Sequence, residues 1–194
     1  MDYSMRFFKK INIIFASFFI LLLIVIGDTF TFSDESKILI KDVVISKNNN
    51  FYNISFNQEL KLDYLIREAI DKGIPLVFKL TLKVVKLDDI FPAKIIKKEV
   101  RYYQIEYKAL RKIYRIYDIN EQKHEYKNMD EAIQKMLQVK SLEFSFIDDG
   151  MNYELWLNAA LERKKLPKPI QVNFFNKTWN IGSENSIHKI GNLN

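Results

Sequence analysis

Two pairs of neighbouring carboxylates are the residues whose types could best support acid–base chemistry. Asp88 and Asp89 form one pair, Asp148 and Asp149 form the other, and each pair falls in a segment that we expect to be a turn. Such pairs could share a proton transfer or bind Ca²⁺ weakly. Aspartate also initiates turns by accepting hydrogen bonds from nearby backbone, and we favour this structural interpretation for both pairs.

The sequence carries no other recognisable catalytic or metal-binding pattern. His124 and His188 are its only histidines, they are far apart, and there is no cysteine. Zinc usually takes three or four nitrogen or sulfur ligands, which this set cannot supply. No G-x-S-x-G nucleophile motif is present, and five scattered glycines cannot build a phosphate-binding loop. We therefore expect no catalytic residue, no metal site and no cofactor.

A basic, tyrosine-rich segment is the strongest functional lead. Residues 95–117 carry seven basic and two acidic side chains, whereas the whole chain has a net charge of +6. Aromatic and basic side chains together can contact anionic lipid headgroups, acidic glycans or nucleic acid. The alternative is structural, because tyrosines pair well across strands and cations keep an exposed face soluble. The candidate interaction surface comprises Lys97, Lys98, Arg101, Tyr103, Tyr107, Arg111, Tyr114 and Arg115.

The N-terminus has the composition of an export signal. Residues 11–26 are apolar apart from Asn12 and Ser17, and basic residues precede them. Their length lies between a secretory signal peptide and a membrane-spanning helix, so both interpretations remain open. In either case the positive-inside rule predicts that the remainder is exported. We expect residues 1–27 to be a signal peptide or single transmembrane anchor, and residues 28–194 to form one exported domain.

Periodicity predicts the elements that would position these residues. Residues 38–56 read as a hairpin, and residues 58–73 as a helix with Asn57 as N-cap and Gly73 at its end. A long strand follows, with one apolar and one polar face, then a loop at residues 88–94. We predict two further strands joined by a turn near residues 108–111.

The second half of the exported chain is predicted to continue in the same style. Asn128 and Glu131 have the spacing of a capping box at the start of a second helix. Residues 141–147 and 152–161 alternate as strands, residues 170–175 suggest a short edge strand, and the tail after Trp179 suggests loose order. We expect an α+β fold rich in β-structure, with antiparallel sheets, a sandwich being one arrangement, and two short amphipathic helices after the N-terminal hydrophobic helix.

Several blocks of the sequence resemble a known family. They are LIREAIDKGIPLVFKLTL at residues 65–82, IEYKALRKIY at 105–114, MDEAIQKM at 129–136 and LPKPIQVNFFNKTWNIGS at 166–183. Together they resemble the domain of unknown function 4390 family, uncharacterised envelope proteins of Gram-negative bacteria. The resemblance spans roughly residues 38–183 and implies an exported or membrane-anchored protein. It implies no activity and no catalytic residues.

We therefore expect a non-catalytic interaction or accessory module. It would be attached to the inner membrane through residues 11–26 with its domain in the periplasm, or be periplasmic after cleavage. Its partner would be an envelope protein, a lipid or a glycan, and export argues against nucleic acid. Two alternatives are a small envelope enzyme that uses carboxylates and a carrier of lipids or other hydrophobic ligands. The enzyme needs two acids in a shared buried cleft, and the carrier needs an open apolar cavity.

Overall fold

The computed structural model describes residues 36–48, 51–88, 90–146, 151–171 and 177–190. The chain divides into two units, residues 1–33 and 34–194, and every described residue belongs to the second. The predicted leader at residues 1–27 therefore lies outside the described residues. None of the helices in the described ranges is long and apolar enough to span a membrane.

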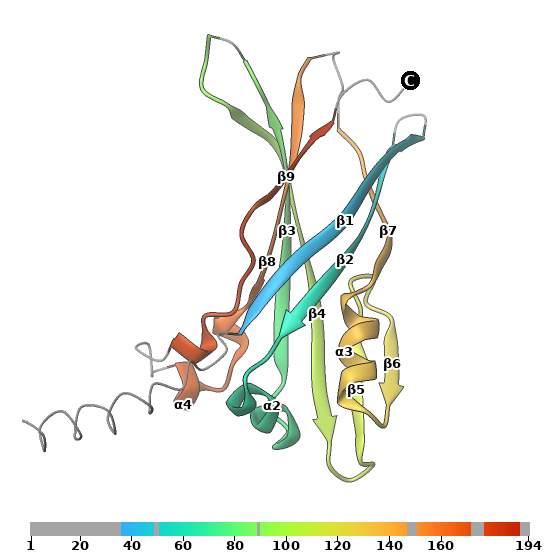
Figure 1. Ribbon diagram of the computed structural model, residues 1–194, viewed down its shortest axis with the longest axis vertical. Coiled ribbons are helices and arrows are strands. Elements are labelled where there is room, and N and C mark those ends of the chain that lie inside the picture. The colour runs from blue at the N-terminus through green and yellow to red at the C-terminus, as the bar shows by residue number, and fades with distance from the viewer. Residues whose placement is uncertain (1–35, 49–50, 89, 147–150, 172–176, 191–194) are drawn as a thin grey trace, which may run out of the picture. The chain divides into compact units, whose positions relative to one another are not determined.

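The described part of the chain contains nine strands, which form two antiparallel sheets (Figure 1). The first sheet has the order β1-β2-β7, with β1 at Lys37–Asn48, β2 at Phe51–Lys61 and β7 at Val139–Phe144. The second has the order β6-β5-β4-β3-β8-β9. Its strands are β3 (Leu76–Lys86), β4 (Lys94–Lys108), β5 (Ile113–Tyr117), β6 (Lys123–Tyr126), β8 (Tyr153–Leu161) and β9 (Ser186–Ile190).

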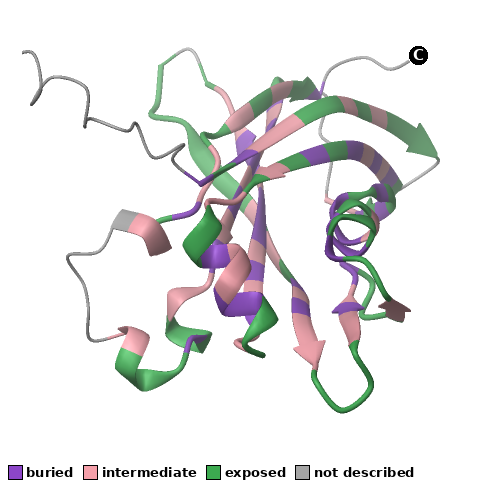
Figure 2. Cartoon of the chain, turned by 60° about the horizontal axis from the view of Figure 1, so that its bottom comes forward, coloured by how far each residue is buried: buried purple, intermediate pink, exposed green. Residues whose placement is uncertain are grey.

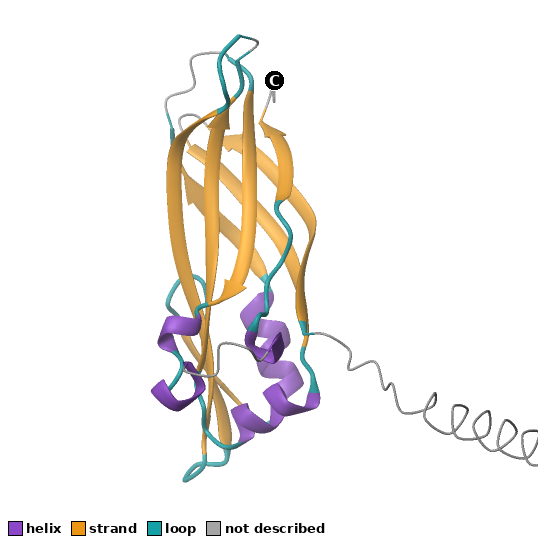
Figure 3. Cartoon of the chain, turned by 90° about the vertical axis from the view of Figure 1, so that its left-hand side faces the viewer, coloured by secondary structure: helices purple, strands orange, loops and turns teal. Residues whose placement is uncertain are grey.

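Short helices connect the strands, and Figure 3 shows that they gather towards one end of the sheets. They are α2 (Tyr64–Asp71), α3 (Met129–Leu137) and α4 (Lys168–Gln171), with 3₁₀ turns η1 (Arg163–Lys165) and η2 (Lys177–Trp179). The β-rich α+β class with antiparallel sheets and two short amphipathic helices, α2 and α3, is confirmed.

Helix α2 begins later than its sequence pattern predicts. Asp63, not Asn57, is the N-cap, and its side chain accepts a hydrogen bond from the N–H of Ile66. Strand β2 continues to Lys61, because its alternation of buried and exposed side chains extends through Gln58. The predicted end is correct: Gly73 has a φ of 84° and follows the C-cap, a backbone conformation that glycine adopts readily.

Asn57 supports a bulge in β1 instead of capping a helix. The register of β1 against β2 shifts between Lys41 and Val44, and Asp42 has a φ of 53°. The Asn57 side-chain amide donates to the Asp42 carboxylate at 3.2 Å. The inserted residue changes the side-chain alternation, which explains why inward positions Ile38 and Ile40 are followed by Val43.

Most other predicted elements are present, and three corrections are needed. The hairpin β1–β2, the turn between β4 and β5, helix α3 with Asn128 as N-cap, and strands β7 and β8 match the prediction. Of the predicted edge strand at residues 170–175, residues 170 and 171 belong to helix α4 instead, and residues 172–175 lie outside the described residues. Strand β6 was missed, and the tail after Trp179 is not loosely ordered throughout, because residues 186–190 form β9 on β8.

The core lies between the inner faces of the two sheets and continues under α2 and α3. Figure 2 shows buried residues alternating with exposed ones along the strands. The largest fully buried side chains include Tyr103, Phe78, Ile66 and Met136. These side chains come from β4, β3, α2 and α3, so one continuous apolar cluster holds both sheets and both helices.

Candidate functional site

The structure does not place the eight predicted surface residues on one surface. Side chains alternate between the two faces of a strand, so neighbouring residues of β4 point in opposite directions. Tyr103 is 1% exposed, and its ring stacks on Phe78 in the core at a centroid distance of 5.4 Å. Its assignment to an interaction surface was wrong, because it shares the inward face of β4 with Ile105.

Tyr107 and Tyr114 also share a face of the sheet, where they pair directly across β4 and β5. Their ring centroids are 4.9 Å apart, and the Tyr114 hydroxyl donates to the Asp71 carboxylate on α2 at 2.6 Å. Partial burial, followed by this hydrogen bond and the negative charge of Asp71, raises the pKa of Tyr114 to about 12. Tyr114 therefore attaches α2 to the sheet, and Tyr107 packs against the Tyr114 ring.

Arg111 and Arg115 belong to a charge network on the opposite face. Both contact Glu125, with nearest N–O distances of 2.8 Å and 3.1 Å, and Arg115 also reaches Glu106 at 3.7 Å. Desolvation raises the pKa of Glu125, but the hydrogen bonds from the two arginines and the charges of Arg111 and Lys123 outweigh it and hold the pKa below its usual value. These cations are neutralised within the sheet.

Lys97, Lys98 and Arg101 occupy the part of β4 beyond its pairing with β5. Arg101 forms an ion pair with Glu99, and the Lys97 ammonium donates to the backbone carbonyl of Ser145 at 2.5 Å. Lys98 has no side-chain partner among the described residues and points to the opposite face from Lys97. The basic segment therefore offers one unpaired exposed cation here rather than a continuous basic patch.

The two histidines serve structural contacts. The His124 ring lies 3.2 Å from the Asp118 carboxylate, and the His188 ring lies 2.7 Å from the Ser186 hydroxyl. Burial lowers the pKa of His188. Within the described ranges, no group of three or more histidine, cysteine or acidic residues is arranged to hold a metal ion.

Of the two carboxylate pairs, only Asp88 lies within the described residues. Its Oδ1 accepts hydrogen bonds from the N–H groups of Ile90 and Phe91, at 2.9 Å and 3.2 Å. These two bonds lower the pKa of Asp88. The turn-forming role predicted for Asp88 is confirmed. Asp89, Asp148 and Asp149 lie outside the described residues.

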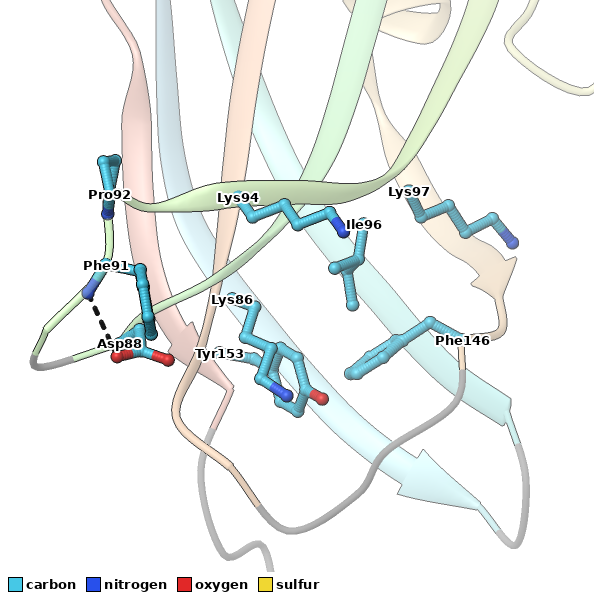
Figure 4. A pocket seen from close by; sticks show the side chains of 9 residues that line it. All are labelled: Lys86, Asp88, Phe91, Pro92, Lys94, Ile96, Lys97, Phe146 and Tyr153. Carbon is cyan, nitrogen blue, oxygen red and sulfur yellow. Dashed lines mark hydrogen bonds between the residues drawn. The ribbon is translucent and has the colours of Figure 1, made fainter.

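A hollow of about 610 Å³ opens where β3 ends and β4 and β8 begin. We call it the mouth hollow, and Figure 4 shows side chains from both sheets around it. Phe146, just after β7, is the contribution from the three-stranded sheet. The lining residues are Lys86, Asp88, Phe91, Pro92, Lys94, Ile96, Lys97, Phe146 and Tyr153.

Aromatic rings form one wall of the mouth hollow. Phe146 packs against Tyr153 edge to face, with ring centroids 4.9 Å apart. On its other side Phe146 stacks on Tyr52 of β2, also at 4.9 Å. Because Tyr153 lies on β8, this chain of rings crosses from one sheet to the other. The wall is therefore supported from behind by the core.

Three lysines surround the same hollow. Lys86 and Lys94 lie directly opposite each other in the antiparallel register of β3 and β4, and Lys86 also lies opposite Tyr153. Like charges in directly opposed positions destabilise a sheet. Lys94 has no side-chain partner among the described residues. The one carboxylate of the lining, Asp88, accepts the N–H groups of its own loop and also interacts electrostatically with Lys86. The site is suited to an anionic group.

Comparison with known protein families supports the resemblance that the sequence blocks quoted above suggest. Residues 35–188 match the family model described as Domain of unknown function (DUF4390). The chain belongs to this family. The match covers both sheets except the last two residues of β9, together with helices α2 and α3 and the whole mouth hollow. No curated protein and no solved structure matches the chain significantly.

Sequence reasoning missed most of the mouth hollow in this DUF4390 domain. Of the nine lining residues, only Lys97 belonged to the predicted surface. One signal was present in the sequence: the loop at residues 88–93 places Ile90, Phe91 and Pro92 between charged residues, where a solvent-exposed turn would ordinarily be polar. Phe146 and Tyr153 gave no comparable signal, because alternating strands routinely carry aromatic residues.

Proposed function

We propose that residues 34–194 form a non-catalytic binding module of the cell envelope, and that the mouth hollow is its ligand site. The observation that carries the proposal is that Lys86 and Lys94, directly opposed in the register of β3 and β4, line a hollow walled by Phe146 and Tyr153. Ligand sites are typically concave and largely apolar, with a few polar groups that set orientation. The volume of about 610 Å³ lies within the usual range for small-molecule sites.

The lining defines the chemistry of the ligand. An ammonium group favours a phosphate or carboxylate, and the aromatic wall favours an apolar body next to it. An anion bound in the mouth hollow would also supply a partner for Lys94, which has no side-chain partner among the described residues. The ligand is therefore an acidic group attached to an apolar chain or ring, such as part of a lipid or of an acidic envelope component.

The ionisation of the described carboxyl groups supports binding over catalysis. The pKa values of Asp88, Glu125 and Glu162 are all lowered, in each case with hydrogen bonds as the cause of the lowering. A carboxyl that acts as general acid near neutral pH needs a raised pKa. In the ranges that the structure describes, the carboxyl groups with lowered pKa values are thus held as anions by their partners. This argues against an enzyme that uses one of these carboxyls as a general acid.

The space between the sheets and the helices favours a surface ligand over a carried one. Tyr103, Phe78 and Leu80 fill it, and none is more than 1% exposed. A carrier would need this interior to be open. The mouth hollow lies at the strand ends instead, where a ligand could enter without displacing the core.

The cellular setting of this proposal rests on the N-terminal sequence. A basic start followed by an apolar segment at residues 11–26 supports export, with the domain in the periplasm and attached to the inner membrane or released by cleavage. The ligand would then be an envelope lipid, a glycan or an acidic group on an envelope protein. An exported domain would not meet nucleic acid.

Calorimetric titration of the purified full-length chain with hexyl phosphate tests the ligand chemistry. This probe combines an acidic group with a short apolar chain. Hexanol and inorganic phosphate each supply one half of it and should bind more weakly. Lys94→Gln should weaken hexyl phosphate binding by about ten- to a hundredfold, because a charge-assisted hydrogen bond contributes about 1.5–3 kcal/mol.

Lys98→Gln is the matched control. It removes the same charge from the same strand, but on the face away from the hollow. Phe146→Ala should weaken binding of hexyl phosphate more than binding of inorganic phosphate. Equal losses for Lys94→Gln and Lys98→Gln, or equal affinity for phosphate with and without its hexyl chain, would contradict the proposal.

A further inference from the structure

The loop between β3 and β4 exposes large apolar side chains at its tip. Ile90 is 84% exposed and Phe91 is 69% exposed, and Pro92 follows them in the exposed loop. We call these three residues the apolar tip. Exposed apolar residues that cluster, rather than occur singly, commonly mark a contact with a membrane or with another protein.

The backbone of the loop holds the apolar tip in place. Asp88 accepts the backbone N–H groups of both Ile90 and Phe91, which fixes the turn that presents their side chains. Next to it, the N–H of Leu87 donates to the carbonyl of Asn152 at 2.9 Å. This bond joins the end of β3 to the residue after Met151, which is itself 56% exposed. A second loop therefore adds an apolar side chain at the same end of the domain.

Cations surround the apolar tip. Lys86 lies before the loop, and Lys94 and Lys98 lie after it. In the register, Lys86 opposes Lys94 next to the loop, and Lys83 opposes Lys98 further along the same two strands. Apolar side chains therefore lie at this end of the domain, and lysines lie next to them along the strands. A membrane surface has the same sequence of layers, because its apolar acyl chains lie beneath anionic phosphates.

We propose that the apolar tip inserts into an anionic lipid surface, with Lys94 and Lys98 against the headgroups. A protein partner is less favoured, because a specific protein contact requires complementary shape around each side chain, whereas fluid lipid accommodates an apolar projection and its charges together. This inference goes beyond the ligand site. Phe91, Pro92 and Lys94 also line the mouth hollow, whereas Ile90, Met151 and Lys98 do not, and insertion does not require a ligand in the hollow.

The absence of cysteine from the sequence permits a local test in the full-length chain. A polarity-sensitive fluorophore is attached through Ile90→Cys, and in a second variant through Leu110→Cys. Leu110 is an exposed apolar residue in the β4–β5 turn, at the other end of β4 (Figure 1). At about 3.4 Å per residue, a strand of this length separates the two positions by about 50 Å. Position 110 thus reports any vesicle association that does not involve the tip.

Each labelled chain is mixed with vesicles of phosphatidylcholine alone or of phosphatidylcholine with phosphatidylglycerol. We expect the label at position 90 to shift to the blue and to be protected from iodide on the anionic vesicles, and the label at position 110 to stay accessible. Adding Lys94→Gln and Lys98→Gln should reduce the protection at position 90, as should raised salt. Phe91→Ser should reduce it as well.

The proposal is overturned if position 90 remains as accessible to iodide as position 110 on anionic vesicles. It is also overturned if both positions are protected equally, because the N-terminal segment alone would then account for the association. Titration with hexyl phosphate in the absence of vesicles reports on the mouth hollow separately. Failure of tip insertion with retained hexyl phosphate binding would therefore count against this inference and leave the proposed ligand site standing.

Discussion

The hydroxyl of Tyr103 donates a hydrogen bond of 2.9 Å to Oε1 of Gln58 inside the core. Tyr103 lies on β4 and Gln58 on β2, so this bond joins the two sheets. The Gln58 amide in turn approaches the carbonyl of Leu137 at the end of α3, at 3.5 Å. A polar contact buried this deeply must be satisfied, because the dry interior offers no replacement partner.

Tyr103→Phe should destabilise the domain by about 1–3 kcal/mol, because Gln58 Oε1 loses its donor in a buried site. Chemical denaturation of the full-length chain measures the change in the free energy of unfolding. Tyr102→Phe is the matched control: its side chain is 47% exposed on the opposite face, and its loss should cost less than about 0.5 kcal/mol. Adding Gln58→Leu to Tyr103→Phe should recover part of the lost free energy of unfolding. If the double variant instead loses the sum of the two single losses, the explanation is contradicted.

Tyr114 should make the domain sensitive to alkaline pH. Burial and the hydrogen bond to Asp71 raise its pKa from 10.0 to about 12 in the folded state, so the folded state retains a proton that the unfolded state releases. Its contribution to stability is therefore complete below about pH 10 and is lost as the pH rises towards 12. The stability difference between the native chain and Tyr114→Phe should narrow over this interval in denaturant unfolding. A difference that stays constant across it would refute the assignment.

The ion pair between Lys79 and Glu162 should contribute in the opposite pH direction. The Lys79 ammonium lies 3.0 Å from Glu162, and this hydrogen bond is the main cause of the lowered pKa of Glu162. A lowered pKa adds stability above the ordinary carboxyl value of 4.5, and this stability is lost as the pH falls through the folded-state pKa. Glu162→Gln should cost up to about 1 kcal/mol at neutral pH and less in acid.

Glu59→Gln provides the comparison for that measurement. Glu59 pairs with Lys41 at 2.7 Å, but both side chains are about half exposed. Solvent and salt screen such a pair, so its removal should change the free energy of unfolding by less than the removal of the Glu162 carboxylate. If Glu59→Gln lowers the free energy of unfolding at neutral pH by more than Glu162→Gln does, partial burial is not what strengthens the Lys79–Glu162 pair.

The N-cap of α3 should contribute measurably to stability. Asn128 Oδ1 accepts hydrogen bonds from the N–H groups of Asp130 and Glu131, at 2.7 Å and 3.1 Å. Asn128→Ala leaves these groups without a side-chain partner and should destabilise the domain by about 1 kcal/mol. Asn128→Ser keeps an acceptor and should retain most of the stability. Denaturation midpoints that are equal for the two variants would contradict the capping role.

Local signals in the sequence were enough for many individual elements. Asn128 with Glu131 marked the start of α3, Gly73 marked the end of α2, and alternation marked β3 and β8. Each of these depends on residues a few positions apart. The start of α2 was misplaced because asparagine is a common N-cap residue. Asn57 instead donates a hydrogen bond to Asp42 on the neighbouring strand, 15 residues away. Strands β6 and β9 are short, and their place was decided by neighbours β5 and β8.

The candidate site depended still more on distant contacts. Seven basic residues in a short segment suggested a basic surface. Alternation along β4 sends the four that lie on this strand to both faces, and Glu106 and Glu125 pair with Arg111 and Arg115. The mouth hollow forms only when the ends of β3, β4 and β8 meet the segment after β7. The charge and the aromatic wall of the hollow come from residues far apart in the sequence. Lys86 and Tyr153, for example, are 67 residues apart, and the β3–β8 register makes them direct neighbours.

From the order of its residues alone, this chain specifies an apolar N-terminal segment, an antiparallel β-rich domain with two helices, and membership of the DUF4390 family. These properties follow from composition, short-range periodicity and caps, all of which act over a few residues. Which cations are paired, that Tyr103 is buried, and where lysines and aromatic rings enclose a hollow were settled by the folded structure. Strand register and sheet packing create those relationships, and no local pattern in the sequence encodes them.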